Sequence, residues 1–271
     1  MAAHLPEAIP RSSGLAASLA IQRRVIGALM LREIITRYGR HNIGILWLAF
    51  EPMLFTLGVA ALWHVAKMHT VTAVPVIAFA VTGYSSVLLW RNVSNRCAKA
   101  IEPNLSLMYH RNVKVLDIFL SRAFLEIAGA TASVALLTAL FAFAGVMSWP
   151  ADPAKAMAGW LMLCWFSLAL GLMVGALSER SEVFERVWHI FTYLMFPLSG
   201  AVFMVHWLPA AAQDVVLWLP MVHGVELVRS GYFGGVVTTY EQPSFMAVIN
   251  ALMTLVGLAL VRHTGRNVRP E

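Results

Sequence analysis

Acidic side chains inside apolar segments are the first places where this sequence could carry chemistry. Glu51 and Glu126 both lie in such segments, and a carboxylate there is costly to bury and could exchange a proton. For Glu51 the alternative is a structural acid near the membrane surface, paired with Arg37 or Arg40. Glu126 lies four residues after Arg122, a spacing at which opposite charges on a helix meet. Neither acid belongs to a relay of titratable groups, which favours a structural role for both.

Signatures of catalytic or metal-dependent chemistry do not occur in the sequence. It contains no GxxxxGK[ST] nucleotide loop, no HExxH and no GxSxG. The nine histidines do not cluster, and the two cysteines, Cys97 and Cys164, lack the spacing of metal ligands. We therefore expect no catalytic residue, no metal site and no cofactor bound by this chain.

A polar segment between two apolar stretches is the second candidate site. It reads AIEPNLSLMYHRNVKVLD over residues 100–117. Because proline is tolerated in the first turn of a helix, Pro103 is expected to begin a short one. An ordinary helix lying on the lipid surface is the alternative interpretation. The residues that would form a docking knob and its polar rim are Pro103, Asn104, Leu105, Leu107, Met108, Tyr109 and Arg111.

Composition identifies the class of protein that must position these residues. Of 271 residues, 59% are hydrophobic and 13% charged, whereas soluble domains average about 45–50% and about 25%. The mean hydropathy is +0.70. Because lipid leaves unpaired backbone groups without partners, and a helical span needs about 20 apolar residues, we predict an all-α integral membrane protein. Its six predicted transmembrane helices are residues 43–66, 71–95, 120–147, 156–178, 187–208 and 243–262.

The basic residues predict the orientation of these spans. With the N-terminus in the cytoplasm, seventeen of the 20 Lys and Arg residues fall on the cytoplasmic side. Cytoplasmic loops carry such an excess, so both termini are predicted to be cytoplasmic. The net charge of +6 then reflects orientation and requires no nucleic-acid partner.

Two further segments flank the spans. Residues 12–40 combine basic and apolar side chains and predict an amphipathic helix at the membrane interface, while residues 1–11 are expected to be flexible. Residues 209–242 have apolar pieces too short to cross, which predicts short helices that dip into or lie on the outer face. The residues singled out in or beside this outer-face segment are Trp207, Trp218, Glu226 and Arg229.

Three stretches together resemble a known family. They are LREIITRYGRHNIGILWLAFEP at 31–52, residues 100–117 followed by SRAFLE at 121–126, and LPMVHGVELVRSGYFGG at 219–235. They are similar to ABC-2 type exporter permeases, in particular the KpsM-type subfamily that exports capsular polysaccharide. The likeness extends over nearly the whole chain, so residues 12–271 are expected to form one ABC-2 type transmembrane domain.

The resemblance implies partners and a role. Residues 100–117 would include a coupling helix that docks on a separate ATPase subunit, which binds the ATP and Mg. The family works as two permease copies with two ATPase copies in the bacterial inner membrane, and it moves a lipid-linked acidic polysaccharide. A periplasmic adaptor of the polysaccharide co-polymerase type would continue the route.

Basic and aromatic side chains are candidates for the polysaccharide path. Arg91, Arg96 and Lys99 flank the cytoplasmic end of the second predicted span, where they would attract an anionic sugar or a lipid headgroup equally well. Sugars also stack on aromatic rings, although such rings more often anchor a protein at the membrane interface. The aromatic candidates are Tyr84, Trp90 and Tyr193.

Other functions remain open at this point. The chain could be a permease for another lipid-linked glycan, of the O-antigen or teichoic acid type. An intramembrane glycan-processing enzyme would need acids or histidines that converge in one cavity. A proton-coupled transporter would need inverted repeats with broken helices in both halves, and the break predicted at Pro197 has no clear mate in the first three spans.

Overall fold

The computed structural model describes residues 14–38, 43–66, 74–110 and 113–267, and these residues form an all-α membrane protein. Residues 1–11, expected to be flexible, lie outside the described part. Five of the described helices are long and apolar enough to cross a membrane. They are α2 (Ile43–Val65), α3 (Val76–Cys97), α5 (Val115–Phe143), α6 (Pro153–Ser178) and α10 (Pro243–Asn267).

The expected six-span count is therefore not reproduced. The fifth predicted span, residues 187–208, corresponds to α7 (Glu182–Leu198), which has 17 residues. At 1.5 Å per residue such a helix is about 25 Å long, shorter than the ~30 Å hydrocarbon core. The apolar residues after α7 form a turn and a short 3₁₀ helix, η2 (Val205–Trp207), instead of continuing it.

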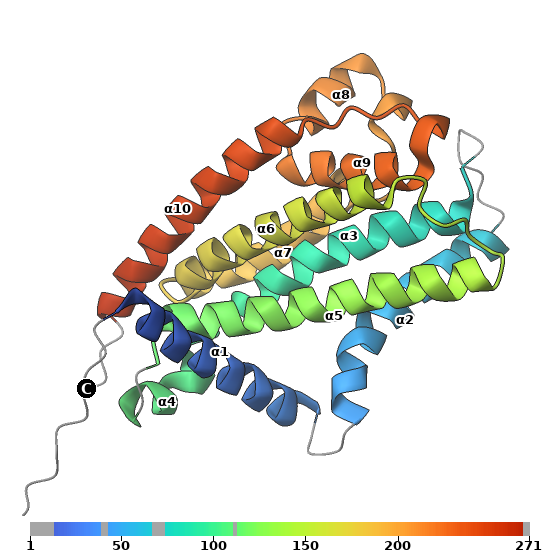
Figure 1. The fold of residues 1–271 in the computed structure, drawn as a ribbon. Helices are drawn as coiled ribbons and strands as arrows, with labels where there is room; N and C mark the ends of the chain where they lie inside the picture. Colours follow the sequence, from blue (N-terminus) through green and yellow to red (C-terminus); the bar gives the residue numbers. More distant parts are fainter. Residues whose placement is uncertain (1–13, 39–42, 67–73, 111–112, 268–271) are drawn as a thin grey trace, which may run out of the picture.

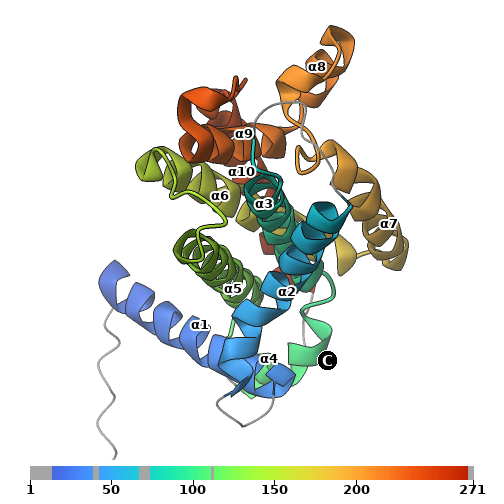
Figure 2. The ribbon, with the colours of Figure 1, turned by 90° about the vertical axis from the view of Figure 1, so that its right-hand side faces the viewer.

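The centre of the fold is formed by α3 and α6, which lie side by side between α5 and α10 (Figures 1 and 2). Most of the apolar window of α3 is buried inside the protein, whereas only about a fifth to a third of the windows of α2, α5 and α10 is buried. Gly171 and Gly175 on α6 permit this close packing, because a Cβ on either would meet Cys97, which ends α3. Their GxxxG spacing thus serves helix packing within one chain.

At one end of the bundle lie α8 (Ala210–Val216), α9 (Pro220–Phe233) and η3 (Gly234–Val236), as Figure 1 shows. Residues 221–233 of α9 are all buried, and the helix packs against α6, α10 and α3. Of the two predicted alternatives for this segment, α9 therefore dips into the protein. Pro220 occupies its first turn, and it ends at Gly234, where φ is +59°.

At the other end lie α1 (Leu15–Tyr38), η1 (Glu102–Asn104) and α4 (Leu105–His110). The helix predicted over residues 12–40 is present as α1, which packs along α5 and beside α2. The segment between α3 and α5 thus forms short helices outside the bundle. This end of the molecule gathers most of the residues that the sequence proposed as a coupling site, and we name it the inner end and the end with α8 and α9 the outer end.

Candidate functional site at the inner end

The segment from Lys99 to Asn104 is fixed at its base to the end of α6. Lys99 adopts the left-handed conformation, with φ of 48°, and its N–H donates to Ser178 Oγ at 3.1 Å. The N–H of Ile101 donates to Glu179 Oε1 at 2.8 Å. Burial raises the pKa of Glu179, and the Ile101 N–H and the charge of Lys99 act against that rise. The chain therefore leaves α3 in a defined direction before η1 begins.

One arginine of α1 holds the next turn of this segment. Arg32 donates from Nη1 to Asn104 Oδ1 and from Nη2 to the Pro103 carbonyl at 3.4 Å. Asn104 is buried and donates in turn to the Ala100 carbonyl at 2.8 Å. Pro103 lies in the first turn of η1, as predicted. A shift of η1 and α4 would therefore also displace α1, through Arg32.

The predicted knob residues of α4 are unequally placed. Leu105 is 39% exposed, whereas Leu107 and Met108 are partly buried and pack against the main core. Tyr109 belongs to α4, but its side chain lies outside what the structure describes, as does the whole of Arg111. Leu105 is thus the described member of the set with an accessible apolar side chain.

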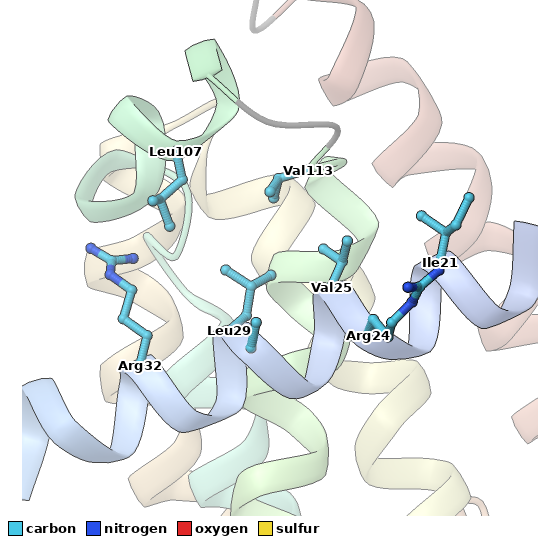
Figure 3. A pocket seen from close by; sticks show the side chains of 8 residues that line it. Ile21, Arg24, Val25, Leu29, Arg32, Leu107 and Val113 are labelled. Atoms are coloured by element: carbon cyan, nitrogen blue, oxygen red, sulfur yellow. The ribbon is translucent and has the colours of Figure 1, made fainter. Parts of the chain in front are cut away.

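A groove separates α1 from α4 (Figure 3). Its apolar wall includes Val25 and Leu29 on α1 and Leu107 on α4, and two arginines, Arg24 and Arg32, also line it. The residues lining the groove are apolar or basic, and none is acidic. Such a surface suits an apolar side chain flanked by carboxylates.

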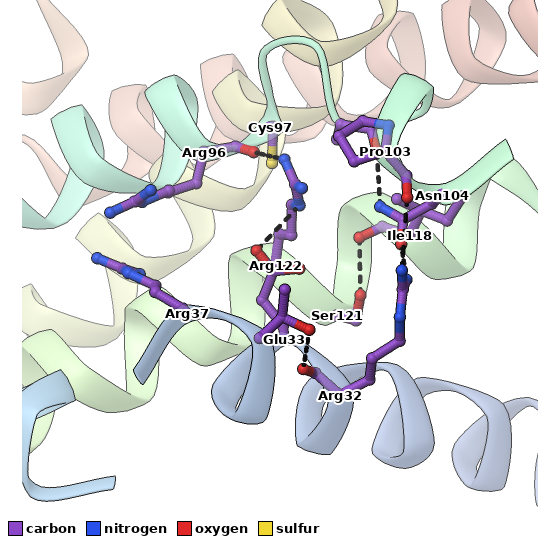
Figure 4. Close-up of polar contacts among 12 residues, drawn as sticks. Arg32, Glu33, Arg37, Arg96, Cys97, Pro103, Asn104, Ile118, Ser121 and Arg122 are labelled. Carbon is purple, nitrogen blue, oxygen red and sulfur yellow. Dashed lines mark hydrogen bonds and ion pairs between the residues drawn. The ribbon is translucent and has the colours of Figure 1, made fainter. Parts of the chain in front are cut away.

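Four charges on four helices meet one turn further along α1, and Figure 4 shows the two bases among them, Arg37 and Arg96. Arg37 on α1 contacts Glu51 on α2 at 2.9 Å and also pairs with Glu126 on α5. Arg96 on α3 lies 3.3 Å from Glu126 and 4.0 Å from Glu51. We call these four residues the inner charge cluster. The expected contact between Glu51 and Arg37 is therefore present.

The predicted pairing of Glu126 with Arg122 is wrong. Arg122 points toward α1 and α3, where Nε lies 3.5 Å from Glu33 and Nη1 donates to the Arg96 carbonyl at 2.9 Å. Interhelical partners replace the i,i+4 pair because α1 packs along α5 and brings acid and base within reach. The charge of Glu33 on α1 is thus balanced by Arg122 on α5.

Several residues of this region were missed from the sequence, among them Arg32, Glu33 and the Gln22–Asp117 pair. The Gln22 side-chain amide donates to Asp117 Oδ1 at 3.0 Å. Asp117 also accepts the N–H of Lys114 at 3.0 Å and so caps the start of α5. The spacing of polar residues along α1 was the available signal, but it does not say which helix they face.

The proposed path residues do not form one lined channel within a single chain. Arg91 and Tyr193 are together, with the guanidinium carbon 4.4 Å from the ring centroid, and Tyr193 is 65% exposed. Tyr84 and Trp90 are buried in the protein. Arg96 belongs to the inner charge cluster, and Lys99 forms the turn after α3.

At the outer end, two residues of α9 bind backbone groups of neighbouring segments. Arg229 is fully buried and donates to the carbonyls of Gly200, Ala201 and Phe203 at 2.6–2.7 Å. Glu226 accepts the N–H groups of Val205 and Tyr240 at 3.4 and 3.2 Å. We call this pair the outer clamp. Both residues are interior rather than on the outer face.

The two predicted outer tryptophans differ. Trp207 stacks on Phe79 of α3, with ring centroids 5.1 Å apart, and the Arg229 guanidinium lies over the same Phe79 ring at 3.8 Å. Trp218 is 76% exposed.

Among the described residues, no three His, Cys, Asp or Glu side chains are arranged to hold a metal ion.

Comparison with known proteins identifies the family of this chain. The chain is 46% identical to "Capsule polysaccharide export inner-membrane protein CtrC" of Neisseria meningitidis serogroup B, over 94% of this chain and 96% of the relative. It is 44% identical to "Capsule polysaccharide export inner-membrane protein BexB" of Haemophilus influenzae, with the same coverage. It is 28% identical to "Polysialic acid transport protein KpsM" of Escherichia coli, over 89% of this chain and 94% of the relative. Residues 24–233 match the ABC-2 type transporter family, so the resemblance stated from the sequence is confirmed, and this chain belongs to that family.

Proposed function

We propose that this chain is the membrane-spanning permease subunit of an ATP-driven exporter that moves lipid-linked acidic capsular polysaccharide across the bacterial inner membrane. The observation that carries the proposal is near full-length similarity to two proteins named for capsule polysaccharide export. The excess of Lys and Arg on one side supports a topology with both termini in the cytoplasm. The chain would act as a transport subunit and not as an enzyme.

ATP hydrolysis belongs to a partner in this proposal. Since the sequence contains no GxxxxGK[ST] loop, the ATP and Mg would be bound by a separate ATPase subunit. That subunit would dock on η1 and α4, whose first turn is linked to α1 through Arg32. The assembly would contain two copies of this chain and two ATPase subunits.

The polysaccharide would pass between the two copies. Arg91 and Tyr193 provide a cation and an exposed ring side by side, a combination that suits an acidic sugar. A periplasmic adaptor of the polysaccharide co-polymerase type would receive the chain on the outer side. Bilayer lipids surround the spans.

Removal of the gene in a capsulated cell tests the transport role. We expect surface polysaccharide to disappear while polymer accumulates inside the cell, measured by antibody binding to intact and to permeabilised cells. Expression of the chain from a plasmid should restore the surface signal. Normal surface polysaccharide in the deletion strain would contradict the proposal.

The substitution Leu105→Glu tests the docking site separately. Leu105 is exposed and lies outside the described spans, so membrane insertion should be unaffected. Loss of an interface anchor commonly costs about 2 kcal/mol or more, which weakens binding by roughly thirtyfold. The ATPase should then no longer co-purify, and export should stop.

Val236→Glu is the matched control, because Val236 is 65% exposed at the opposite end of the molecule. It should keep the ATPase bound. If Leu105→Glu retains the ATPase as well as this control does, docking through α4 is wrong, whatever the outcome of the gene deletion.

A further inference from the structure

A second groove lies between α5 and α6, at the end of the bundle that also carries α8 and α9. Its cavity volume is 510 Å³, within the range of about 300–1,000 Å³ that is common for small-molecule sites. One wall is α5 with Thr131 and Ala135, and the other is α6 with Met157 and Trp160. Thr82 of α3 and Val228 of α9 also line it. The groove shares no lining residue with the inner site.

The far side of this groove is rigid, because α6 and α9 are in backbone contact. A Cβ on Gly231 of α9 would meet the backbone N of Ala156 at 2.2 Å, and one on Gly159 of α6 would meet the N of Val228 at 2.6 Å. The connection between α5 and α6 is fastened to the same helix, since Asp152 N–H donates to the Gly231 carbonyl at 2.8 Å. The groove is therefore held open by packed backbone.

Four of its six hydrogen-bonding side chains are engaged with the protein itself, the other two being Thr138 and Trp149. Trp160 Nε1 donates to Thr131 Oγ1 at 2.9 Å, and Thr82 Oγ1 donates to the Ala78 carbonyl at 2.9 Å. The Tyr232 hydroxyl donates to the Ser148 carbonyl. No charged residue is among those that line the groove. A glycan would lose most of its hydrogen bonds to water here without replacement, so the groove favours an apolar occupant.

The mouth of the groove faces sideways, between two candidate membrane spans. Ala135 and Met157, one on each wall, are exposed, as is Trp149 in the connection between the two helices. The surrounding faces of α5 present further exposed apolar side chains such as Leu136 and Leu140. The groove is thus continuous with the surface that meets lipid hydrocarbon. Apolar walls disfavour water, and an empty cavity forfeits dispersion contacts.

We propose that this groove binds one acyl chain of a bilayer phospholipid. A methylene occupies about the volume of a water molecule in the liquid, ~30 Å³, so the cavity accommodates most of an ordinary membrane acyl chain. The chain would lie against Trp160 and Val228 and would bring lipid into contact with α9. This site rests on the five apolar spans and not on the proposed export function.

Fluorine NMR with 5-fluorotryptophan tests the proposal on the full chain in nanodiscs. The discs contain phosphatidylethanolamine and phosphatidylglycerol, with a fraction carrying a nitroxide at mid-chain. Trp160 is only 6% exposed, so a mid-chain nitroxide comes closest to its ring from inside the groove, and paramagnetic broadening falls steeply as that distance grows. We expect its resonance, assigned with Trp160→Phe, to be broadened by the labelled lipid.

Two other tryptophans calibrate this measurement. Trp165 on α6 is 36% exposed and should broaden in any case, whereas Trp90, 2% exposed and outside the groove, should remain sharp. Ala135→Phe fills the mouth of the groove and should return the Trp160 resonance to the sharpness of Trp90. Leu136→Phe, on the adjacent exposed position of α5, should leave the broadening unchanged.

Three results would overturn the proposal. The first is a Trp160 resonance that stays as sharp as that of Trp90 in labelled lipid. The second is broadening that appears only when a spin-labelled lipid-linked glycan is added, which would make the occupant the transported molecule. The third is efficient disulfide formation between copies carrying Ala135→Cys, which would show that a second copy covers the groove.

Discussion

At the inner end Arg37 and Arg96 are shared between two carboxylates on other helices, whereas at the outer end Arg229 is bound by three backbone carbonyls. The inner charge cluster is partly open to solvent, with Glu51 47% and Arg96 41% exposed as side chains. The outer clamp is closed, with Arg229 fully buried. The same residue type therefore occurs in two different physical settings.

The two arrangements differ in whether their charged groups can change pairing partners. Two bases and two acids can re-pair with little loss when one helix shifts, and partly exposed pairs are worth only about 0–1 kcal/mol. A guanidinium that satisfies three buried carbonyls has no equivalent second position, and leaving such groups unpaired is costly. We infer that the inner end is built to move and that the outer end is built to hold the turn after α7 against α3 and α9.

Breaking the outer clamp should have the largest effect. Arg229→Met keeps the length of the side chain but leaves the carbonyls of Gly200, Ala201 and Phe203 without their donor. At about 1–3 kcal/mol for each unsatisfied buried group, we expect a loss of at least about 3 kcal/mol. The melting temperature and the yield of monodisperse protein, measured in detergent by size exclusion, should both fall sharply.

Arg186→Met is the control, because Arg186 is 78% exposed as a side chain and pairs only loosely, at 3.5 Å, with Glu182. Arg229→Lys should recover part of the loss, since an ammonium group can reach one or two of the carbonyls. An Arg229→Met protein that melts with wild type would remove the basis for calling the outer end fixed.

The acidic member of the outer clamp should matter less. Glu226→Gln keeps one carbonyl oxygen but turns an NH₂ group toward either the Val205 or the Tyr240 N–H. At that position the hydrogen bond is lost, because the NH₂ group and the backbone N–H are both donors. We expect the free energy of unfolding to fall by about 1–3 kcal/mol. The melting temperature should fall between those of wild type and Arg229→Met, with Glu182→Gln unchanged as the control. A Glu226→Gln protein more damaged than Arg229→Met would reverse this order.

At the inner end the nearly buried member should respond most. Glu126 is 8% exposed as a side chain and contacts both Arg37 and Arg96. In Glu126→Gln both arginines still have Glu51 as a partner. We therefore expect the free energy of unfolding to fall by about 1 kcal/mol rather than by several. Hydrogen exchange should rise in the last turns of α1 and stay unchanged in α9. Faster exchange in α9 would mean that the two ends are not independent.

The sequence predicted most of the helices at the two ends of the molecule but not which residues on them pair with one another. Apolar segments of sufficient length predicted all five candidate spans, with each end within five residues, and Pro103 predicted the start of η1. The span expected at residues 187–208 is not confirmed, because α7 ends at Leu198 and is followed by a backbone turn that Arg229 stabilises, and a count of apolar residues does not reveal such a turn. Local spacing suggested Arg122 for Glu126, whereas packing of α1 along α5 supplied Arg37 instead. Pairs between helices depend on how each helix is rotated and how far it is shifted along its neighbour. Neither can be read from a single sequence.

The smallest effect should come from Glu51, and it separates two mechanisms. Its side chain is 47% exposed and pairs with Arg37 at 2.9 Å, so Glu51→Gln should cost at most about 1 kcal/mol. If Glu51 is structural, the variant should be recovered in slightly lower yield, but export should keep the pH dependence of wild type, measured in cells between mildly acidic and mildly alkaline medium. The matched control is Glu182→Gln, in an exposed pair on α7. A proton-coupled transporter would behave differently, because export would follow an imposed proton gradient and vanish in Glu51→Gln. That result would show that the inner charge cluster carries protons, and the contrast with the outer clamp would then be one of chemistry and not only of mobility.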